Sequence, residues 1–332
     1  MNYDAAVSTA GNAQVEAWTL DPDDLRSPSS WTDTGQQAAF IRLDGQATSP
    51  LNVLPPFPLI GLGDARHLLA AQMDALIEPP VSAEGLVRSI ETSPRAAAVA
   101  VQLLRNLHGV PVTQALPLES LCYATLQGSA EHAAWLKART VPEGLSAAGQ
   151  LLIEREGPVL QLTLDRADAR NALDCALRAQ LYDAFSLATL DRDIQCVQLR
   201  ATGATFSIGG DLHEFGTTRD PATAHLIRSR TLPAIAVSRC PAKFEVHVQG
   251  ACIGAGIELA AFAARLTAEP DAWFQLPELA MGLIPGAGGC VSIPARIGRQ
   301  RTALMILSGR RVNAATALRW GLIDAIESHP AR

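Results

Sequence analysis

Lysine is nearly absent from this sequence: among its 27 lysines and arginines, only Lys137 and Lys243 are lysines. The formal net charge of the 332 residues is −6, so the chain has no overall basic character that would attract nucleic acid. We therefore expect no nucleic-acid partner. The excess of arginine suits bidentate contacts to anions, although the base composition of the genome is a simpler explanation.

The sequence also lacks the patterns of metal sites, secretion and membrane insertion. None of its six cysteines forms a CxxC pair, and no His/Cys cluster has zinc-ligand spacing. The N-terminal stretch MNYDAAVSTAGNAQVEAW has no basic start followed by an apolar run, and no apolar run is long enough to cross a bilayer. We therefore expect a cytoplasmic protein with reduced thiols, no metal and no membrane association.

Hydrophobic residues make up 48% of the chain and charged residues 18%, which is typical of one or two globular domains. Turn-forming residues dominate positions 1 to 60, which are predicted to be irregular. Helical patterns follow at 63–78, 94–109 and 117–139, and the stretch 140–150 resembles a linker. In the third pattern Leu118, Leu121, Cys122 and Thr125 recur at helical spacing. We predict a mainly helical N-terminal region, residues 1–145, with an irregular first part.

Strand and helix patterns alternate from Leu151 onward. The first two strands are joined by a turn at 156–158, and an amphipathic helix follows at 177–191. Further strands are predicted at 194–202 and 243–254, with two short ones within 263–278. This alternation predicts an α/β core over residues 150–332.

Three glycine-rich turns, at 203–215, 250–259 and 276–294, follow strand patterns in the core. None matches a Walker loop or a well-placed dinucleotide-binding motif. If Ala255 begins a helix, the amides of its first turn are unpaired and can stabilise an oxyanion. Taken alone, Glu258 and Glu278 are simply acids in a first helical turn, where they complement the helix dipole.

Taken together, these turns and acids indicate a reaction centre. Two turns can each aim one amide at a shared point, and each of two neighbouring turns supplies a carboxylate. Such a set can hold a thioester oxygen as it becomes an enolate, while the acids exchange protons with the adjacent carbons.

The same residues carry a family resemblance. The matching segments are RADARNALD (166–174), FSIGGDLHEF (206–215), GACIGAGIELAAFA (250–263), FQLPELAMGLIPGAGG (274–289), RIGRQRTALMILSGR (296–310) and ATALRWGLIDAI (315–326). In this order they resemble the crotonase (enoyl-CoA hydratase/isomerase) superfamily over residues 153–326, about half of the chain. The resemblance implies a spiral of repeated β-β-α units, preceded here by the mainly helical N-terminal region.

The resemblance also implies roles for individual residues. The oxyanion-hole amides would be those of Gly210 and Ala255, and Glu258 and Glu278 match the two carboxylates that distinguish the hydratases of the family. Gly288 and Gly289 would flank the acyl pocket. Contacts to coenzyme A would come from Ala169, Arg170, Ala172, Leu173, Ser207, Ile208, Gly209 and Asp211. Coenzyme A would enter as part of the substrate, and no other cofactor is implied.

The chain departs from the family pattern at both ends. Members usually continue after the GLID motif with helices that cover the acyl-CoA site and help to form trimers, whereas this sequence ends at Arg332. Its N-terminal region instead resembles that of crotonase-type proteins related to dihydroxyphenylacetyl-CoA dioxygenase. We expect residues 80–140 to pack near the acyl site on the core of their own or a neighbouring subunit. We also expect the protein to form a homo-oligomer, a trimer or hexamer.

Four functions fit the resemblance. The leading hypothesis is an enoyl-CoA hydratase acting on an acyl-CoA thioester, in which Glu258 activates water and Glu278 protonates the α-carbon. The alternatives are an enoyl-CoA isomerase, a cofactor-independent arylacetyl-CoA dioxygenase and a non-catalytic acyl-CoA-binding protein. The cluster Arg296, Arg299, Arg301, Arg310 and Arg311 is most simply a solvated surface; contact with the CoA phosphates is the other interpretation.

Overall fold

The computed structural model describes residues 15–26, 35–44, 49–140 and 147–328. Its N-terminal elements are η1 (Pro22–Arg26), β1 (Ala39–Leu43), β2 (Leu59–Gly63), η2 (Ala70–Gln72), β3 (Ala75–Leu76), α3 (Ala83–Thr92), α4 (Pro94–Asn106), α5 (Val112–Gln127) and α6 (Ala130–Ala138). Next come β4 (Gln150–Glu156), β5 (Val159–Asp165), η3 (Ala167–Ala169), α7 (Cys175–Leu190), β6 (Cys196–Ala201), η4 (Leu212–Glu214), α8 (Pro221–Thr231) and α9 (Pro233–Arg239). The last elements are β7 (Lys243–Val248), β8 (Ala251–Ile253), α10 (Ala255–Ala260), β9 (Arg265–Ala268), β10 (Trp273–Gln275), η5 (Glu278–Met281), α11 (Gly289–Ser308), β11 (Val312–Asn313), α12 (Ala314–Trp320) and β12 (Ala325–Ile326).

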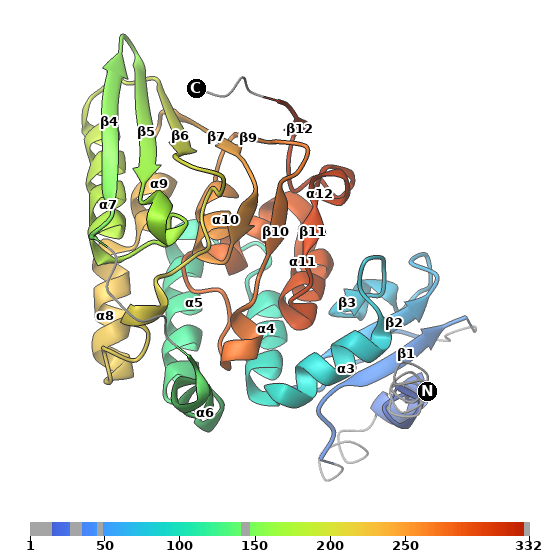
Figure 1. Cartoon of the computed structure of the whole chain (residues 1–332). Helices are drawn as coiled ribbons and strands as arrows, with labels where there is room; N and C mark the ends of the chain where they lie inside the picture. The colour runs from blue at the N-terminus through green and yellow to red at the C-terminus, as the bar shows by residue number, and fades with distance from the viewer. Residues whose placement is uncertain (1–14, 27–34, 45–48, 141–146, 329–332) are drawn as a thin grey trace, which may run out of the picture.

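The core contains a six-stranded and a three-stranded sheet, and helices follow β5, β6, β8, β10 and β11 (Figure 1). The larger sheet has the order β12-β9-β7-β6-β5-β4, in which only the β4–β5 hairpin is antiparallel. The smaller sheet has the order β11-β10-β8. The hairpin at 156–158 and the helix at 177–191 are confirmed, as is the crotonase-like α/β architecture of strand pairs and helices. The single strand predicted at 243–254 is instead two strands, β7 and β8, which belong to different sheets. The other strands predicted in the core are confirmed.

Alternating side chains explain why β5 forms a strand in this position. Leu160, Leu162 and Leu164 are buried, whereas the residues between them are half-buried. Helix α7 covers the sheet, and it begins where the Asp174 carboxylate accepts a hydrogen bond from the N–H of Leu177.

A small parallel sheet in the N-terminal region corrects two sequence predictions. Its order is β1-β2-β3, and it lies at the end of the molecule away from the β4–β5 hairpin (Figure 1). The region 1–60, expected to be irregular, contains β1 and the start of β2. The helix expected at 63–78 is wrong, since these residues hold the end of β2, η2 and β3. The reason is burial: short apolar runs covered on both faces form parallel strands, and strand pairing outweighs an accidental helical spacing.

The helical predictions further along the chain are partly right. Helix α4 is confirmed, while the pattern at 117–139 is two helices, broken at Gly128 and restarted where Ser129 caps α6. The expected apolar face of α5 is wrong: Leu118 and Leu121 are 40% and 49% exposed. The buried face instead includes Leu116, Glu119 and Ser120.

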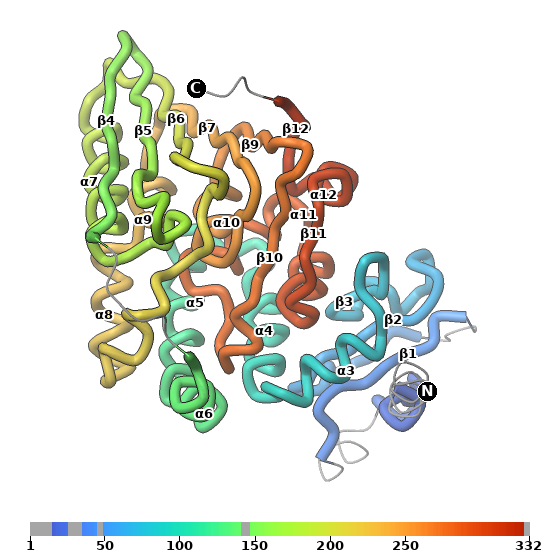
Figure 2. The backbone as a smooth tube through the Cα atoms, viewed as in Figure 1, coloured from blue at the N-terminus to red at the C-terminus, as the bar shows by residue number. Residues whose placement is uncertain are grey.

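Helices α4, α5 and α6 pack on the core of their own chain, as expected. Helix α5 lies beside α8, α9 and α11, α4 packs against α11, and α6 contacts η5 (Figure 2). The largest cluster of buried hydrophobic side chains therefore includes residues of both regions, such as Leu104 and Ile293. The division at residues 145–150 remains a prediction from the sequence.

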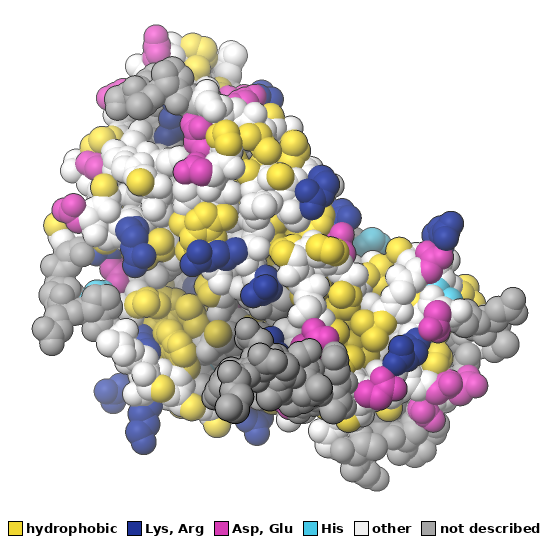
Figure 3. All heavy atoms as spheres, turned by 45° about the vertical axis from the view of Figure 1, so that its right-hand side comes forward, with side chains coloured by type: hydrophobic (Ala, Val, Ile, Leu, Met, Phe, Trp, Pro, Cys, Tyr) yellow, Lys and Arg dark blue, Asp and Glu magenta, His cyan; other side chains and the backbone are white. Residues whose placement is uncertain are grey.

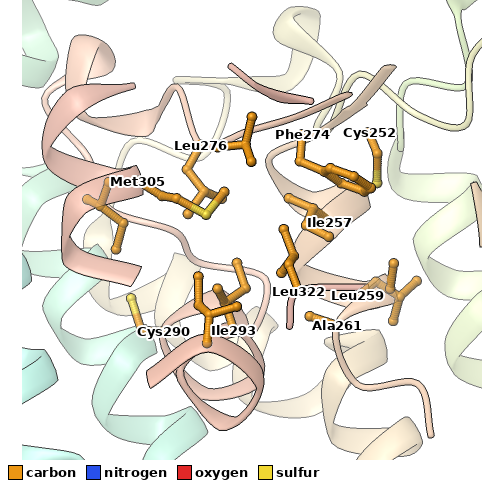
Figure 4. Close-up of a cluster of buried hydrophobic side chains, with 14 of the residues drawn as sticks. Cys252, Ile257, Leu259, Ala261, Phe274, Leu276, Cys290, Ile293, Met305 and Leu322 are labelled. Carbon is orange, nitrogen blue, oxygen red and sulfur yellow. The ribbon is translucent and has the colours of Figure 1, made fainter. Parts of the chain in front are cut away.

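The side chains beneath the third glycine-rich turn are apolar. Figure 4 shows Ile257 and Leu259 of α10 among Phe274, Ile293 and Leu322, all of which are buried. This packing holds α10 firmly against α11.

On the face in Figure 3, basic, acidic and hydrophobic side chains are interspersed. No helix among the described residues is long and apolar enough to cross a membrane.

Candidate active site

Two of the glycine-rich turns lie against each other. The turn that follows β6 runs alongside β8, since Ser207 donates its N–H to the Ala251 carbonyl and accepts one from Ile253. A β-carbon placed on Gly209 would lie 2.9 Å from the carbonyl oxygen of Ile253 and 3.4 Å from the amide nitrogen of Ala255. Gly209 also has a φ of +89°, so only glycine fits this contact comfortably.

The amides of Gly210 and Ala255 are available for a ligand. Neither N–H has an acceptor among the described residues. Both residues line a cavity of about 230 Å³ that Glu258 and Glu278 also line. The structure thus brings the four predicted catalytic residues to one cavity, and a ligand oxygen between the two amides would receive two hydrogen bonds.

Glu258 lies in the first turn of α10 and is only 2% exposed. Its Oε2 accepts hydrogen bonds from the N–H of Ala287, at 2.7 Å, and of Gly289, at 2.9 Å. Burial raises the pKa of Glu258 from 4.5 to about 7, and these N–H bonds oppose the rise. A carboxyl group with this pKa can accept a proton near neutral pH.

Glu278 begins η5 and is 9% exposed. Its Oε2 is buried and has no hydrogen-bond partner among the described residues. Its Oε1 faces the turn at Gly254, where an added β-carbon would lie 2.6 Å away. Burial raises the pKa of Glu278 well above 4.5, and the charges of Glu258 and Glu119 raise it further. Glu278 is therefore suited to carry a proton at neutral pH.

The N-terminal region supplies a third buried carboxyl group, which the sequence analysis missed. Glu119 of α5 is completely buried, and it accepts hydrogen bonds from the N–H of Gly288 and of Cys290, both at 2.7 Å. Its position on the helix was the available signal, because Glu119 shares a face with Ala115 and Leu116, four and three residues earlier. The apolar residues Leu118 and Leu121 pointed to the wrong face.

Helices α5 and α6 also contact the loops that carry the predicted acids. The ring of Tyr123 lies against Gly286 and lines the cavity. In α6, the Nδ1 atom of His132 lies 2.9 Å from the carbonyl oxygen of Met281, at the end of η5. His132 is buried, which lowers its pKa. These two helices cover the cavity from the side of the N-terminal region.

Two arginines that the sequence analysis did not single out line the cavity, Arg178 and Arg228. Arg178 pairs with Glu214 at 2.7 Å. Arg228 lies with its guanidinium carbon 4.5 Å from the centre of the Tyr123 ring, and it donates to Ser120 and Gln127. No carboxylate partner of Arg228 occurs in the described part of the chain.

The arginine cluster near the C-terminus lies elsewhere. Arg296 binds the carbonyl groups of Leu322 and Ala263, Arg299 pairs with the buried Asp74, and Arg301 pairs with Glu78. None of these three lines the cavity of Glu258. Their contacts connect α11 to neighbouring elements, so the interpretation as a CoA phosphate site has no support at these positions.

The residues predicted to contact coenzyme A lie on two turns that are hydrogen-bonded to each other. Arg170 has a positive φ of 51° and is exposed, and its carbonyl group accepts a bond from the N–H of Ile208. Ala172 and Leu173 are buried. The side chain of Ser207 binds the Asn171 carbonyl and the Gly209 amide, and that of Asp211 pairs with Arg166. Both side chains are thus occupied, and of the predicted set only Asp211 lines the cavity directly. Ala169 and Gly209 lie within the same two turns.

Comparison with known proteins agrees with this geometry. Residues 154–331, more than half of the chain, match the family described as enoyl-CoA hydratase/isomerase. A 2,3-dehydroadipyl-CoA hydratase of Escherichia coli is 33% identical over 177 residues, covering 53% of this chain and 69% of the relative. A cyclohexa-1,5-dienecarbonyl-CoA hydratase of Thauera aromatica is 32% identical over 178 residues, covering 54% and 67%. The structure of AtuE from Pseudomonas aeruginosa has a TM-score of 0.51 and 30% identity, covering 54% of this chain and 70% of that one.

Two amides and two protonatable carboxyl groups around one cavity define an oxyanion-stabilising site of the crotonase type. The chain belongs to the enoyl-CoA hydratase/isomerase family. This confirms the family expected from the motifs.

Proposed function

We propose that this protein is an enoyl-CoA hydratase, which adds water across the α,β double bond of an acyl-CoA thioester. The observation that carries the proposal is that two buried acids with raised pKa values line one cavity together with two free backbone amides. Relatives whose names describe hydratases of CoA thioesters support it.

In this mechanism the thioester oxygen lies between the N–H groups of Gly210 and Ala255. Glu258 takes a proton from water as the water oxygen bonds to the β-carbon. The π electrons move toward the thioester, whose oxygen becomes the enolate held by the two amides. Glu278 then gives its proton to the α-carbon, and the carbonyl group re-forms. Glu258 finishes protonated and Glu278 ionised, so solvent exchange restores the starting state.

Coenzyme A binding is assigned to the two turns beside the cavity. The segment Ala169–Leu173 and the segment Ser207–Asp211 would contact coenzyme A mainly through backbone groups, because the Ser207 and Asp211 side chains are already paired. Arg178 and Arg228 provide cations for anionic groups of the ligand. No cofactor beyond the CoA moiety is needed, and we propose a homo-oligomer in a soluble compartment.

The dioxygenase alternative is less well supported. Stabilising a carbanion for reaction with oxygen calls for a dry, apolar oxygen pocket, whereas this cavity carries Glu258 and Glu278. The isomerase alternative uses the same amides with one acid moving the proton. The non-catalytic alternative leaves the stability cost of the buried acids without a benefit.

The test is incubation of the full chain with crotonyl-CoA, a longer enoyl-CoA and an enoyl-CoA with a terminal carboxylate. Loss of the absorbance of the conjugated thioester, with a hydroxyacyl-CoA product, is the expected result. A shift of the double bond without uptake of water would identify an isomerase instead. Tight binding without turnover of any of the three would overturn the assignment as an enzyme.

A further inference from the structure

Glu119 comes from outside the part of the chain that matches the family, yet it binds the same helix terminus as the predicted base. The N–H groups of Ala287 and Gly289 bind Glu258, and those of Gly288 and Cys290 bind Glu119. Four successive amides at the start of α11 are therefore shared alternately between two carboxyl groups. Those of Gly288, Gly289 and Cys290 belong to the N-terminus of α11, where an α-helix leaves amides without internal partners.

This arrangement couples the position of the two side chains. Both oxygens of Glu119 accept an N–H, which fixes the turn before α11 to α5. The same turn provides both donors for Oε2 of Glu258. A displacement of Gly288 or Cys290 would move the intervening Gly289, and with it the carboxyl group of Glu258.

The arrangement also couples their charges. Burial raises the pKa of Glu119 well above 4.5, the charge of Glu258 adds to this rise, and the two N–H bonds oppose it. The two acids therefore compete for ionisation on one helix terminus.

We propose that Glu119 is a positioning residue for the hydration reaction: its carboxyl group accepts the N–H groups of Gly288 and Cys290, and so fixes the turn that holds Glu258. This role rests on the hydratase function proposed above. It means that the N-terminal region contributes to the reaction through a residue buried behind the cavity, in addition to covering the cavity.

The groups that face Glu119 come from five elements, α5 included, and one of these groups is a cation. They are Glu258 of α10, Glu278 of η5, Cys290 of α11, Arg228 of α8 and Cys122 of α5 itself. Arg228 favours the ionised form of Glu119, whereas the two glutamates oppose it. The thiols of Cys122 and Cys290 have raised pKa values, because they are buried and near Glu119, and they remain neutral.

Glu131 provides a matched control. Its carboxylate in α6 accepts hydrogen bonds from the N–H groups of Arg95 and Ala96 at the start of α4, at 2.9 and 3.1 Å. Glu131→Gln removes a two-oxygen helix cap in the same region, as Glu119→Gln does, but this cap does not lie on the cavity. Glu119→Asp retains the charge and shortens the side chain by one methylene group.

The experiment measures the titration of Glu258 by NMR in full-length protein with ¹³C-labelled glutamate carboxyl groups, the resonance being assigned by its loss in Glu258→Gln. Glu119→Gln and Glu119→Asp should each raise the proton affinity of Glu258 several-fold, because a displaced turn weakens the N–H bonds that oppose the rise in its pKa, whereas Glu131→Gln should leave it within about twofold. In parallel, Glu119→Gln should lower kcat about tenfold at neutral pH with little change in KM, and should move the acidic limb of the pH profile of kcat to higher pH.

The titration and the kinetics test two different claims, so one claim can be wrong while the other holds. If the wild-type protein hydrates none of the enoyl-CoA substrates, the proposed function is wrong, and the titration still tests whether Glu119 controls Glu258. If Glu258 titrates alike in Glu119→Gln and Glu131→Gln, and both variants have the same pH profile, Glu119 is only a helix cap and the inference is overturned. Should Glu119→Gln fail to fold, an unchanged kcat in Glu119→Asp would equally contradict the positioning role.

Discussion

Replacing Glu258 by glutamine should abolish hydration and also remove a pH-dependent loss of stability. The amide oxygen of glutamine can still accept the N–H groups of Ala287 and Gly289, so the turn keeps its acceptor. The amide cannot take a proton from water, and loss of a positioned general base typically lowers kcat about 10²- to 10⁴-fold. The variant therefore separates the chemical role of this side chain from its structural one.

The effect on stability follows from the raised pKa. Burial raises the pKa of Glu258 from 4.5 to about 7, so the folded chain holds this proton more tightly than the unfolded chain does. The resulting stabilisation is fully present below pH 4.5 and is lost as the pH rises through about 7. A pKa rise of this size corresponds to about 3 kcal/mol of unfolding free energy. Glutamine does not ionise, so the unfolding free energy of the variant should not fall in this way as the pH rises.

The assay compares thermal unfolding of the wild-type protein and Glu258→Gln across the pH range, together with turnover of crotonyl-CoA. Between about pH 5 and about pH 8.5, the melting temperature of the variant should rise relative to wild type by roughly 5 °C. A difference in melting temperature that stays constant over this range would refute the raised pKa. Turnover within about tenfold of wild type would refute the role of Glu258 as base.

Three further predictions follow from the same geometry. Glu278→Gln should abolish hydration while leaving CoA-thioester binding near normal, because the amide keeps the shape without a transferable proton; a variant with most of the wild-type kcat would remove Glu278 from its role. The double variant at positions 258 and 278 should be little slower than either single one, since both groups act on one transition state, and multiplicative losses in kcat would exclude the shared-water mechanism. A chain beginning at Ala147 should be insoluble or inactive. It leaves the N–H groups of Gly288 and Cys290 without Glu119, and it exposes apolar side chains of the core. A soluble chain with the parent turnover rate would contradict the covering role of the N-terminal helices.

The strands and catalytic turns of the core were predictable because their signals are local. In β5, burial on one face of the strand requires alternating apolar side chains. At Gly209 and Gly254, a positive φ favours glycine. The resemblance then supplied the roles of Glu258 and Glu278, which the structure brings to one cavity.

The N-terminal region was less predictable for a physical reason. Short parallel strands such as β3 are stabilised by pairing with distant segments, so their sequence carries a weak local signal that was mistaken for a helix. In α5 the exposed leucines Leu118 and Leu121 suggested a buried face that packing assigns to Glu119. A buried carboxylate resembles a surface residue until its partners are known.

The sequence by itself determined the α/β core, the two oxyanion turns and the two acids that follow them, because each depends on residues close together in the chain. Only the tertiary structure decided that α5 lies against the start of α11 and that Glu119 shares its amides with Glu258. The amides of Gly288 and Cys290 are 169 and 171 residues away from the carboxylate that binds them. No local pattern encodes a contact over that separation; it arises because the unpaired amides of a buried helix terminus need an acceptor, and folding brings α5 into place to provide one.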